Sequence, residues 1–338
     1  MYNNHLHSVL LKQNDIKNEF DELEKLYCIK PIYFWDEARQ PHFGEGWLCE
    51  YIILGVTFGV GIIAKSFLEY PFKKIGDSAF KAVFELFKSI ALKYKRKKSF
   101  FYIKNVVEGT TITVFLESDM LKNEKLLIET QEIVEKLTKL IQEQNEFVTY
   151  YYEGSFLVKY DSRCEDLMIY PSRFDMEIEG GSLFTTSYGW ALVDNPDPTK
   201  NPTFQIDNLL LIRALFHRSL FEYTKALSYF KKAVQVSTKN INVYLEMGST
   251  LFMARRYSEA INCWQKCIDI TDNDRDKSRV YFNIGCGYTM LNSMNQAADM
   301  FSNALALGLD RSIIESDPTL EIFRNSKEYT KIYNLSLQ

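Results

Sequence analysis

Residues 248–267 read GSTLFMARRYSEAINCWQKC, and their small and aromatic residues set a spacing that recurs along the C-terminal third of the chain. A copy stands thirty-four positions earlier, and another follows after a three-residue enlargement. The small, small, aromatic and small positions of the three copies are, in chain order, Ala214, Ala226, Phe230 and Ala233; Gly248, Ala260, Trp264 and Cys267; and Gly285, Ala297, Phe301 and Ala304. Three copies of one pattern predict a tandem structural repeat.

The spacing has a physical explanation in two antiparallel helices per copy. Only small residues let the helix axes approach closely where the helices cross. Large residues, Leu210, Tyr244 and Tyr281, lie one turn before the small residue of each first helix. One helix pair cannot bury its apolar face alone, whereas a stack of three can. We therefore expect an all-α array in this part of the chain.

The pattern resembles the tetratricopeptide repeat (TPR) family, whose spacing of small and aromatic residues is matched closely by Gly248, Tyr257, Ala260 and Trp264. The resemblance covers residues 207–333, about a third of the chain. It implies a solenoid of three repeats that holds a segment of another protein in a concave groove.

The tail of the array predicts a capping helix. Asp317 and Pro318 provide a helix start, and Leu320, Phe323 and Tyr329 follow at helical spacing. The last apolar face of a repeat array must be covered, so we expect this helix to close the stack.

In the TPR family the first helix of each repeat lines the groove, which implies a set of candidate partner-binding residues here. They are Leu211, Leu215, Leu245, Ser249, Phe252, Arg279, Phe282, Cys286 and Thr289. Members that clamp a C-terminal carboxylate use Lys and Asn there, so that function is not implied. The mostly apolar set predicts an apolar or amphipathic protein segment as partner. The alternative is a groove filled by the N-terminal half of this chain.

Composition limits the other classes of function. The 338 residues include 40 basic and 44 acidic side chains, which gives no overall positive field for nucleic acid. Six scattered cysteines without a CxxC pair indicate reduced thiols. The N-terminus lacks the pattern of a secretory signal, so we expect a cytoplasmic protein.

Residues 1–98 are predicted to be a helical region. Residues 8–27 show an acidic amphipathic helical pattern, and residues 31–35 a short strand. The most apolar run, residues 51–64, contains Gly55 and Gly59 and is too short for an ordinary transmembrane helix. We interpret it as a buried core helix, with a lipid-facing helix as the alternative.

Residues 71–96 predict an amphipathic helix with a Phe-rich face and a basic end. Basic residues at a helix C-terminus complement the helix dipole, which is the simpler interpretation. The alternative is a peripheral membrane surface. Its candidate contact residues are Phe72, Phe80, Phe84, Phe87, Lys95, Arg96 and Lys97.

Residues 99–191 are predicted to form a small α+β domain. Segments 100–104, 110–116, 147–152, 156–160 and 166–170 read as strands, and 121–144 as a helix packed on their sheet. Residues 192–206 read as a linker, followed by the array in residues 207–338. The predicted fold class is therefore α+β: N-terminal helices, a small mixed sheet with one packed helix, then a TPR solenoid of three repeats with a capping helix.

No motif predicts catalysis. Residues 59–64 match a dinucleotide fingerprint without the strand and acid that it requires, and the four histidines do not converge with acids or cysteines. We expect no cofactor, no metal and no enzymatic activity. The predicted function is a protein-interaction adaptor or scaffold. The alternatives are a membrane-associated effector of the bacterial defence or toxin-immunity type, with the repeats as sensor, and an enzyme within residues 99–191.

Overall fold

The computed structural model describes residues 29–34, 51–58, 83–85, 87, 88, 92, 98–117, 120–151, 155–172 and 205–335. The chain divides into two compact units, residues 1–204 and 205–338. The first unit contains a β-sheet with helices, and the second is entirely helical in its described residues. The predicted helix at residues 8–27 lies outside the described residues.

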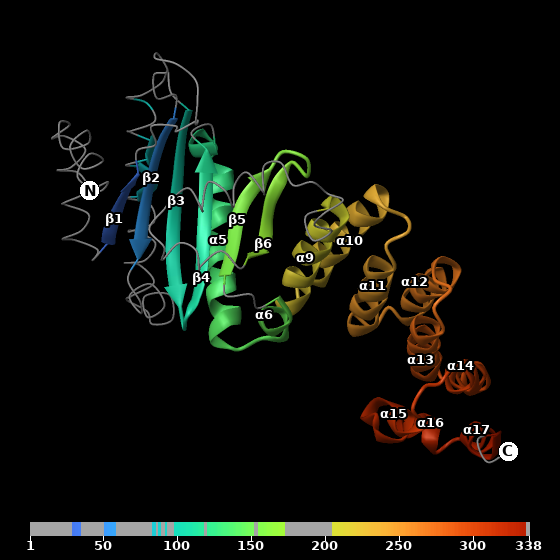
Figure 1. Ribbon diagram of the computed structural model, residues 1–338. Helices are drawn as coiled ribbons and strands as arrows, with labels where there is room; N and C mark the ends of the chain where they lie inside the picture. The colour runs from blue at the N-terminus through green and yellow to red at the C-terminus, as the bar shows by residue number, and fades with distance from the viewer. Residues whose placement is uncertain are drawn as a thin grey trace, which may run out of the picture. The chain divides into compact units, whose positions relative to one another are not determined.

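The first unit is built on a mixed six-stranded sheet (Figure 1). The strands are β1 (Ile29–Phe34), β2 (Tyr51–Phe58), β3 (Lys98–Val107), β4 (Thr110–Glu117), β5 (Ser155–Asp161) and β6 (Asp166–Ser172), and they lie side by side in chain order. The pairs β2–β3 and β4–β5 are parallel, and the other three pairs are antiparallel. Two parallel crossovers therefore alternate with hairpins.

Helix α5 (Glu124–Gln142) connects β4 to β5, after a 3-10 turn at Met120–Lys122. The other crossover, from β2 to β3, includes the described helical residues Val83, Phe84 and Phe87, which are buried. Both crossovers move the same way across the sheet, but their strands point in opposite directions. Residues 110–116 of β4 are all buried, as a strand covered on both faces requires.

The structure corrects two predictions in this unit. Residues 51–58 of the predicted core helix form strand β2, which pairs with β1 and β3. A short unbroken apolar run is compatible with a strand as well as with a helix, so periodicity alone does not separate the two. The predicted strand at 147–152 is helix α6 (Glu146–Tyr151), where the Asn145 side chain accepts a hydrogen bond from the Phe147 amide at 3.0 Å.

The other predicted elements of this unit coincide with observed ones. The predicted segments 31–35, 100–104, 110–116, 156–160 and 166–170 overlap β1, β3, β4, β5 and β6, and 121–144 overlaps α5. A mixed sheet with helices followed by a helical array agrees with the predicted α+β class. Strands β1 and β2, from the predicted helical region 1–98, extend the same sheet, so the sheet is larger than predicted.

The second unit begins with three helix pairs. They are α9 (Ile206–Ser219) with α10 (Tyr223–Val236), α11 (Ile241–Met253) with α12 (Tyr257–Ile270), and α13 (Asp274–Met290) with α14 (Met294–Ala306). Figure 1 shows α9, α11 and α13 in one row and their partner helices in a second row. The tandem helical repeat predicted from the small and aromatic residues is thereby confirmed.

The small residues lie at close helix crossings, as their spacing predicted. A Cβ atom added to Gly248 would overlap the indole ring of Trp264, and one added to Gly285 would lie 2.6 Å from the Phe301 ring. The Trp264 Nε1 group also donates a hydrogen bond of 3.2 Å to the Leu245 carbonyl. The aromatic ring of each second helix therefore occupies the space that the glycine leaves.

We expect Gly248→Ala to lower the free energy of unfolding by about 1–2 kcal/mol. The destabilisation from overpacking the core exceeds the stabilisation from the higher helix propensity of alanine. The first repeat has Ala214 and Phe230 at the equivalent positions, both fully buried. The double variant Gly248→Ala/Trp264→Phe reproduces that pair and should be less destabilised than the sum of its single variants. Urea unfolding followed by circular dichroism measures this coupling. Additive effects would contradict the proposed steric origin.

The turn between the two helices of each pair contains a residue with positive φ. These residues are Phe221, Arg255 and Asn292, with φ of 59°, 60° and 57°. Asparagine tolerates this left-handed conformation, whereas a bulky aromatic residue rarely adopts it. Phe221 is also 73% exposed, so its ring gains little burial in return.

We expect Phe221→Gly to raise the free energy of unfolding by about 1 kcal/mol, because glycine adopts positive φ without steric cost. The matched control is Asn292→Gly at the same position of the third repeat. It should change stability by only a few tenths of a kcal/mol, because asparagine is already suited to this conformation. Equal effects in the two turns, measured by thermal unfolding, would show that the phenylalanine is not strained.

The C-terminal segments close the array. They are α15 (Arg311–Ser316), a 3-10 turn at Pro318–Leu320, α16 (Glu321–Arg324) and α17 (Lys327–Leu335). Leu320, Phe323 and Ile332 are buried in one cluster with Phe301. The predicted start at Asp317 is a side-chain cap, since its Oδ1 accepts from the Thr319 amide at 2.8 Å. The predicted single capping helix is therefore a series of short helices.

Candidate partner-binding surface

The first helices of the repeats form the candidate surface, and its residues differ widely in exposure. Leu211 and Leu215 on α9 are each only 7% exposed. Every residue of α9 from Leu209 to His217 is buried, so this helix is covered around its whole circumference. The prediction assumed one open helix face, and the part of these two leucines in partner binding stays a prediction.

On α11 the candidates follow one helix face. Leu245, Ser249 and Phe252 are half-buried, and the Ser249 hydroxyl donates to the Leu245 carbonyl at 3.0 Å. Phe252 packs inward on other rings, with centroid distances of 5.2 Å to Tyr257 and 5.9 Å to Trp264. Leu245 and Ser249 are consequently accessible without a change of packing, while Phe252 also belongs to the core.

On α13 the candidates divide in the same way. Arg279 is exposed, whereas Phe282 packs 5.8 Å from the Phe301 ring. Cys286 and Thr289 are buried, and the Thr289 hydroxyl donates to the Gly285 carbonyl at 2.9 Å. The capping cluster includes Cys286 and contacts Phe282, so the cap occupies much of this helix face.

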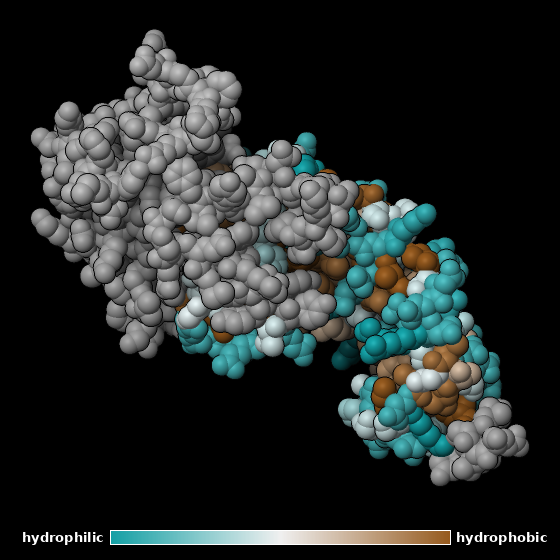
Figure 2. Space-filling model, viewed as in Figure 1, coloured by the Kyte–Doolittle hydropathy of each residue, from teal (hydrophilic) through white to brown (hydrophobic). Residues whose placement is uncertain are grey.

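The accessible surface of the array is therefore shifted from the predicted one. Asn242 and Met253 are exposed on α11 and were not among the predicted residues. Residues 242, 245, 249 and 252 recur at helical spacing, so Asn242 extends the face that carries Leu245 and Ser249. Figure 2 shows apolar side chains gathered over α11 and α12, and again over α13 to α16, on the face in view. We name Asn242, Leu245, Ser249 and Arg279 the inner surface.

Polar contacts between repeats hold this surface in place. Arg218 at the end of α9 forms an ion pair with Glu246 on α11. The Asn240 side chain donates to Asp207 at 2.7 Å and to Asn208 at 3.0 Å, while it caps α11. These links join residues about one repeat apart, and the sequence pattern of apolar positions carried no signal for them.

His217 lies in a buried aromatic and charged environment within the first repeat. Its ring stacks on Tyr229 at 5.3 Å, and its Nδ1 lies 2.6 Å from a carboxylate oxygen of Glu222. Burial, together with the positive charge of Arg213, lowers the pKa of His217 to about 4 despite the favourable contact with Glu222. His217 is therefore neutral at physiological pH. Its ring has a packing role rather than the role of a general acid.

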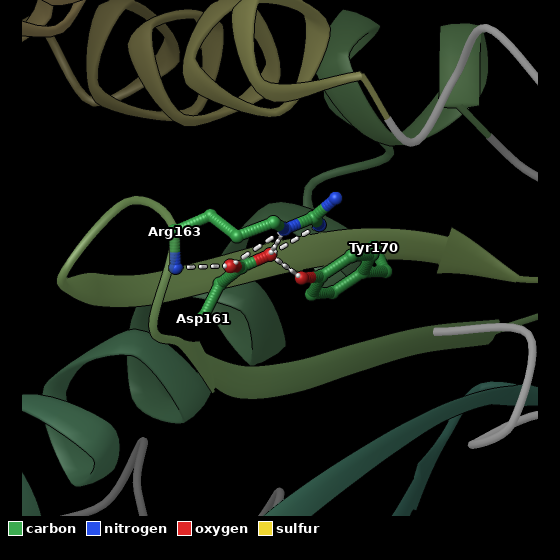
Figure 3. A network of polar contacts seen from close by, with 3 residues as sticks. All are labelled: Asp161, Arg163 and Tyr170. Carbon is green, nitrogen blue, oxygen red and sulfur yellow. Dashed lines mark hydrogen bonds and ion pairs between the residues drawn. The ribbon is translucent and has the colours of Figure 1, made fainter. Parts of the chain in front are cut away.

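A second polar network lies at the β5–β6 hairpin of the first unit (Figure 3). The buried Asp161 carboxylate accepts hydrogen bonds from Arg163 Nη2 at 2.5 Å and from the Tyr170 hydroxyl at 2.6 Å. Burial pushes the pKa of Asp161 upward, but the bonds from Arg163 and Tyr170 outweigh it, so the net pKa is lowered. Four donor groups of Arg163 and Tyr170 bond to this carboxylate, which suits a structural role in holding the hairpin better than proton transfer.

Three of the four described thiols lie in surroundings that disfavour the thiolate. Burial raises the pKa of Cys263 to about 11 and that of Cys267 to about 12, and it also raises the pKa of Cys286. A thiol reacts as its thiolate, so these three are unreactive near neutral pH. Among the described residues there is no group of three or more His, Cys, Asp or Glu side chains that could hold a metal ion.

The candidate membrane residues are only partly described. Phe84 and Phe87 are buried, and their membrane contact stays a prediction. Phe72, Phe80, Lys95, Arg96 and Lys97 lie outside the described residues. In the described part of the chain, no helix combines the length and the apolar character that crossing a membrane requires.

Solved structures of TPR domains are similar to part of this chain. The first TPR domain of human RPAP3 is 13% identical, with 40% of this chain and 98% of that chain covered and a TM-score of 0.31. The TPR domain of Arabidopsis OM64 is 15% identical, with 38% and 94% covered and a TM-score of 0.30. The Yersinia enterocolitica secretion chaperone SycD, in complex with a peptide of the translocator YopD, is 14% identical, with 38% and 92% covered and a TM-score of 0.30.

No family model and no curated protein matches the chain. The TPR-type fold of residues 205–335 rests on the three helix pairs and on the close contacts of Gly248 and Gly285 with their aromatic partners.

Proposed function

We propose that this protein is an interaction adaptor whose helical array binds a segment of another protein on the inner surface. The observation that carries the proposal is the row of accessible side chains on consecutive first helices, Asn242, Leu245 and Ser249 on α11 and Arg279 on α13. A repeat stack presents such a row on a rigid support, because each helix pair is held by its neighbours.

The chemistry of the inner surface favours an uncharged or weakly acidic partner segment. Leu245 supplies apolar contact, Asn242 and Ser249 supply hydrogen-bonding groups, and Arg279 is the exposed cation. The Arg218–Glu246 pair neutralises itself between α9 and α11. An apolar or amphipathic segment, with a carboxylate near Arg279, is therefore the partner that this surface suits best.

The test is co-purification from the native host with the full chain, followed by mass spectrometry. Ser249→Arg places a long charged side chain on the inner surface and loses only a hydrogen bond within its own helix. We expect it to reduce retention of a specific partner about tenfold, the loss that one disrupted central contact causes. Phe252 and Phe282 are unsuitable for this purpose, because their rings also pack in the core.

The matched control is Lys266→Glu on the exposed side of α12. It changes charge on a second helix and should leave partner retention unchanged, while the loss of the exposed Lys266–Asp269 ion pair lowers stability by less than about 1 kcal/mol. A partner retained equally by wild type, Ser249→Arg and Lys266→Glu would contradict binding on the inner surface. Circular dichroism of each variant shows whether the array remains folded.

A further inference from the structure

A second surface of the array lies where each first helix ends and turns into its partner. Apolar side chains are unusually exposed there: Phe221 by 73%, Met253 by 47%, Met290 by 39% and Leu291 by 40%. Arg255 is exposed in the middle turn. We name Phe221, Met253, Arg255, Met290 and Leu291 the turn edge.

The repeat places these residues along one line. Met253 and Met290 are the last residues of α11 and α13, and Phe221 and Arg255 occupy the same position of successive turns. Equivalent positions of stacked repeats follow one another at about the spacing of packed helices, 8–10 Å. The three turns therefore span about 20 Å, the length of a helix of about 14 residues.

Phe221 adopts a strained backbone conformation without gaining burial of its ring. Its backbone is left-handed, its ring is mostly in water, and its ring contact is with the neighbouring Tyr223 at 6.3 Å. Residues whose backbone strain is not offset by packing cluster at functional sites. Exposed methionines beside it adapt their shape to varied apolar partners.

The charges along the edge favour an acidic group on the partner. Glu259 is engaged by Arg256 through two hydrogen bonds of 2.7 and 2.6 Å, and Glu222 contacts His217 and Lys225. Within the described part of the chain, no ion pair involves Arg255. The carboxylates of Glu222 and Glu259, which lie beside the turn edge, are therefore paired with neighbouring side chains. Arg255 is then the cation among the apolar side chains of the turn edge.

We propose that the turn edge binds an amphipathic helix of a partner protein, with apolar residues around one carboxylate that pairs with Arg255. The apolar row provides the contact area, and the single cation sets the position of the helix along the row. This surface shares no residue with the inner surface, so the two binding activities are separable by mutation.

The experiment selects helical peptides of about 14 residues from a display library against the full-length protein. The selected peptides should carry one Asp or Glu within an apolar face. Their affinity, measured by fluorescence polarisation, should fall about tenfold with Phe221→Gly and with Arg255→Glu. Replacing the acid of the peptide by lysine should restore binding to Arg255→Glu.

Phe221→Gly makes this test independent of folding, because the same change is expected to stabilise the array. Weaker binding by a more stable protein cannot arise from unfolding. Ser249→Arg serves as the control variant and should leave binding of these peptides unchanged.

Failure to select an amphipathic acidic peptide, or binding that is indifferent to both edge variants, would overturn the proposal. So would a concentration-dependent dimer that Phe221→Gly abolishes, since a second copy of the chain would then cover the edge. Co-sedimentation with phosphatidylserine vesicles that depends on Phe221 and Arg255 would assign the edge to a membrane surface instead.

Discussion

Replacing Phe301 by alanine is expected to lower the free energy of unfolding of the array by about 3–5 kcal/mol, the range for deletion of a buried aromatic side chain. Phe301 is fully buried, and its ring lies 4.7 Å from Phe323 and 5.8 Å from Phe282. It also fills the space beside Gly285. One ring therefore joins the third repeat to the cap, and its loss leaves a cavity between them.

Two measurements separate this effect from a general loss of structure. Urea unfolding followed by circular dichroism gives the change in stability. Hydrogen exchange should show that amides of α16 and α17 lose protection more than those of α10. The control is Ile322→Ala on the exposed side of α16, which should change stability by less than about 0.5 kcal/mol. Uniform loss of protection along the array would contradict a local role for Phe301.

Acidification from pH 6.5 to pH 4 is expected to destabilise the first repeat by about 3 kcal/mol through His217. The pKa of His217 is lowered to about 4 in the folded protein, mainly because the ring is buried and secondarily because Arg213 is near. In the unfolded chain the imidazole takes up a proton near pH 6.5, while the folded protein does not. The contribution is complete above pH 6.5, is lost as the pH falls toward 4, and changes no further below that.

The measurement is the free energy of unfolding across this pH range for wild type and for His217→Gln. Glutamine does not titrate. The difference in the free energy of unfolding between the two proteins should therefore change with pH mainly between pH 6.5 and pH 4. The lowered pKa of Asp161 changes stability in the same direction: its carboxylate stabilises the fold above its ordinary pKa and loses this effect at lower pH. Subtracting the curves removes this second contribution. Parallel curves would show that His217 does not titrate differently in the two states.

The array was predictable because its signals are local. The contact between Gly248 and Trp264 joins residues within one helix pair, and the same pair recurs with Gly285 and Phe301. Helical geometry converts such a sequence interval directly into a distance. The strands β3 to β6 were predictable for a similar reason, because β-branched and aromatic residues cluster in short segments between turn residues.

For the candidate partner-binding residues, the pattern shows which helix face a residue occupies but not what lies against that face. Leu215 and Ser249 stand at equivalent positions of two repeats, yet Leu215 is buried and Ser249 is accessible. Phe282 occupies the face of α13 that the cap covers. Exposure depends on residues distant in sequence, which a single periodic pattern does not specify.

The repeat, its helix pairs and the need for a cap follow from the order of residues in the chain, since small and aromatic side chains at regular intervals leave few other ways to bury their apolar surface. The conformation of residues 51–58, the burial of α9, and the exposure of the turn edge depend on the folded arrangement. An apolar run is compatible with a strand and with a helix, and residues 51–58 form the strand that pairs with β1 and β3. The turn edge likewise becomes a surface only when stacking aligns Phe221, Arg255 and Met290 from three separate repeats.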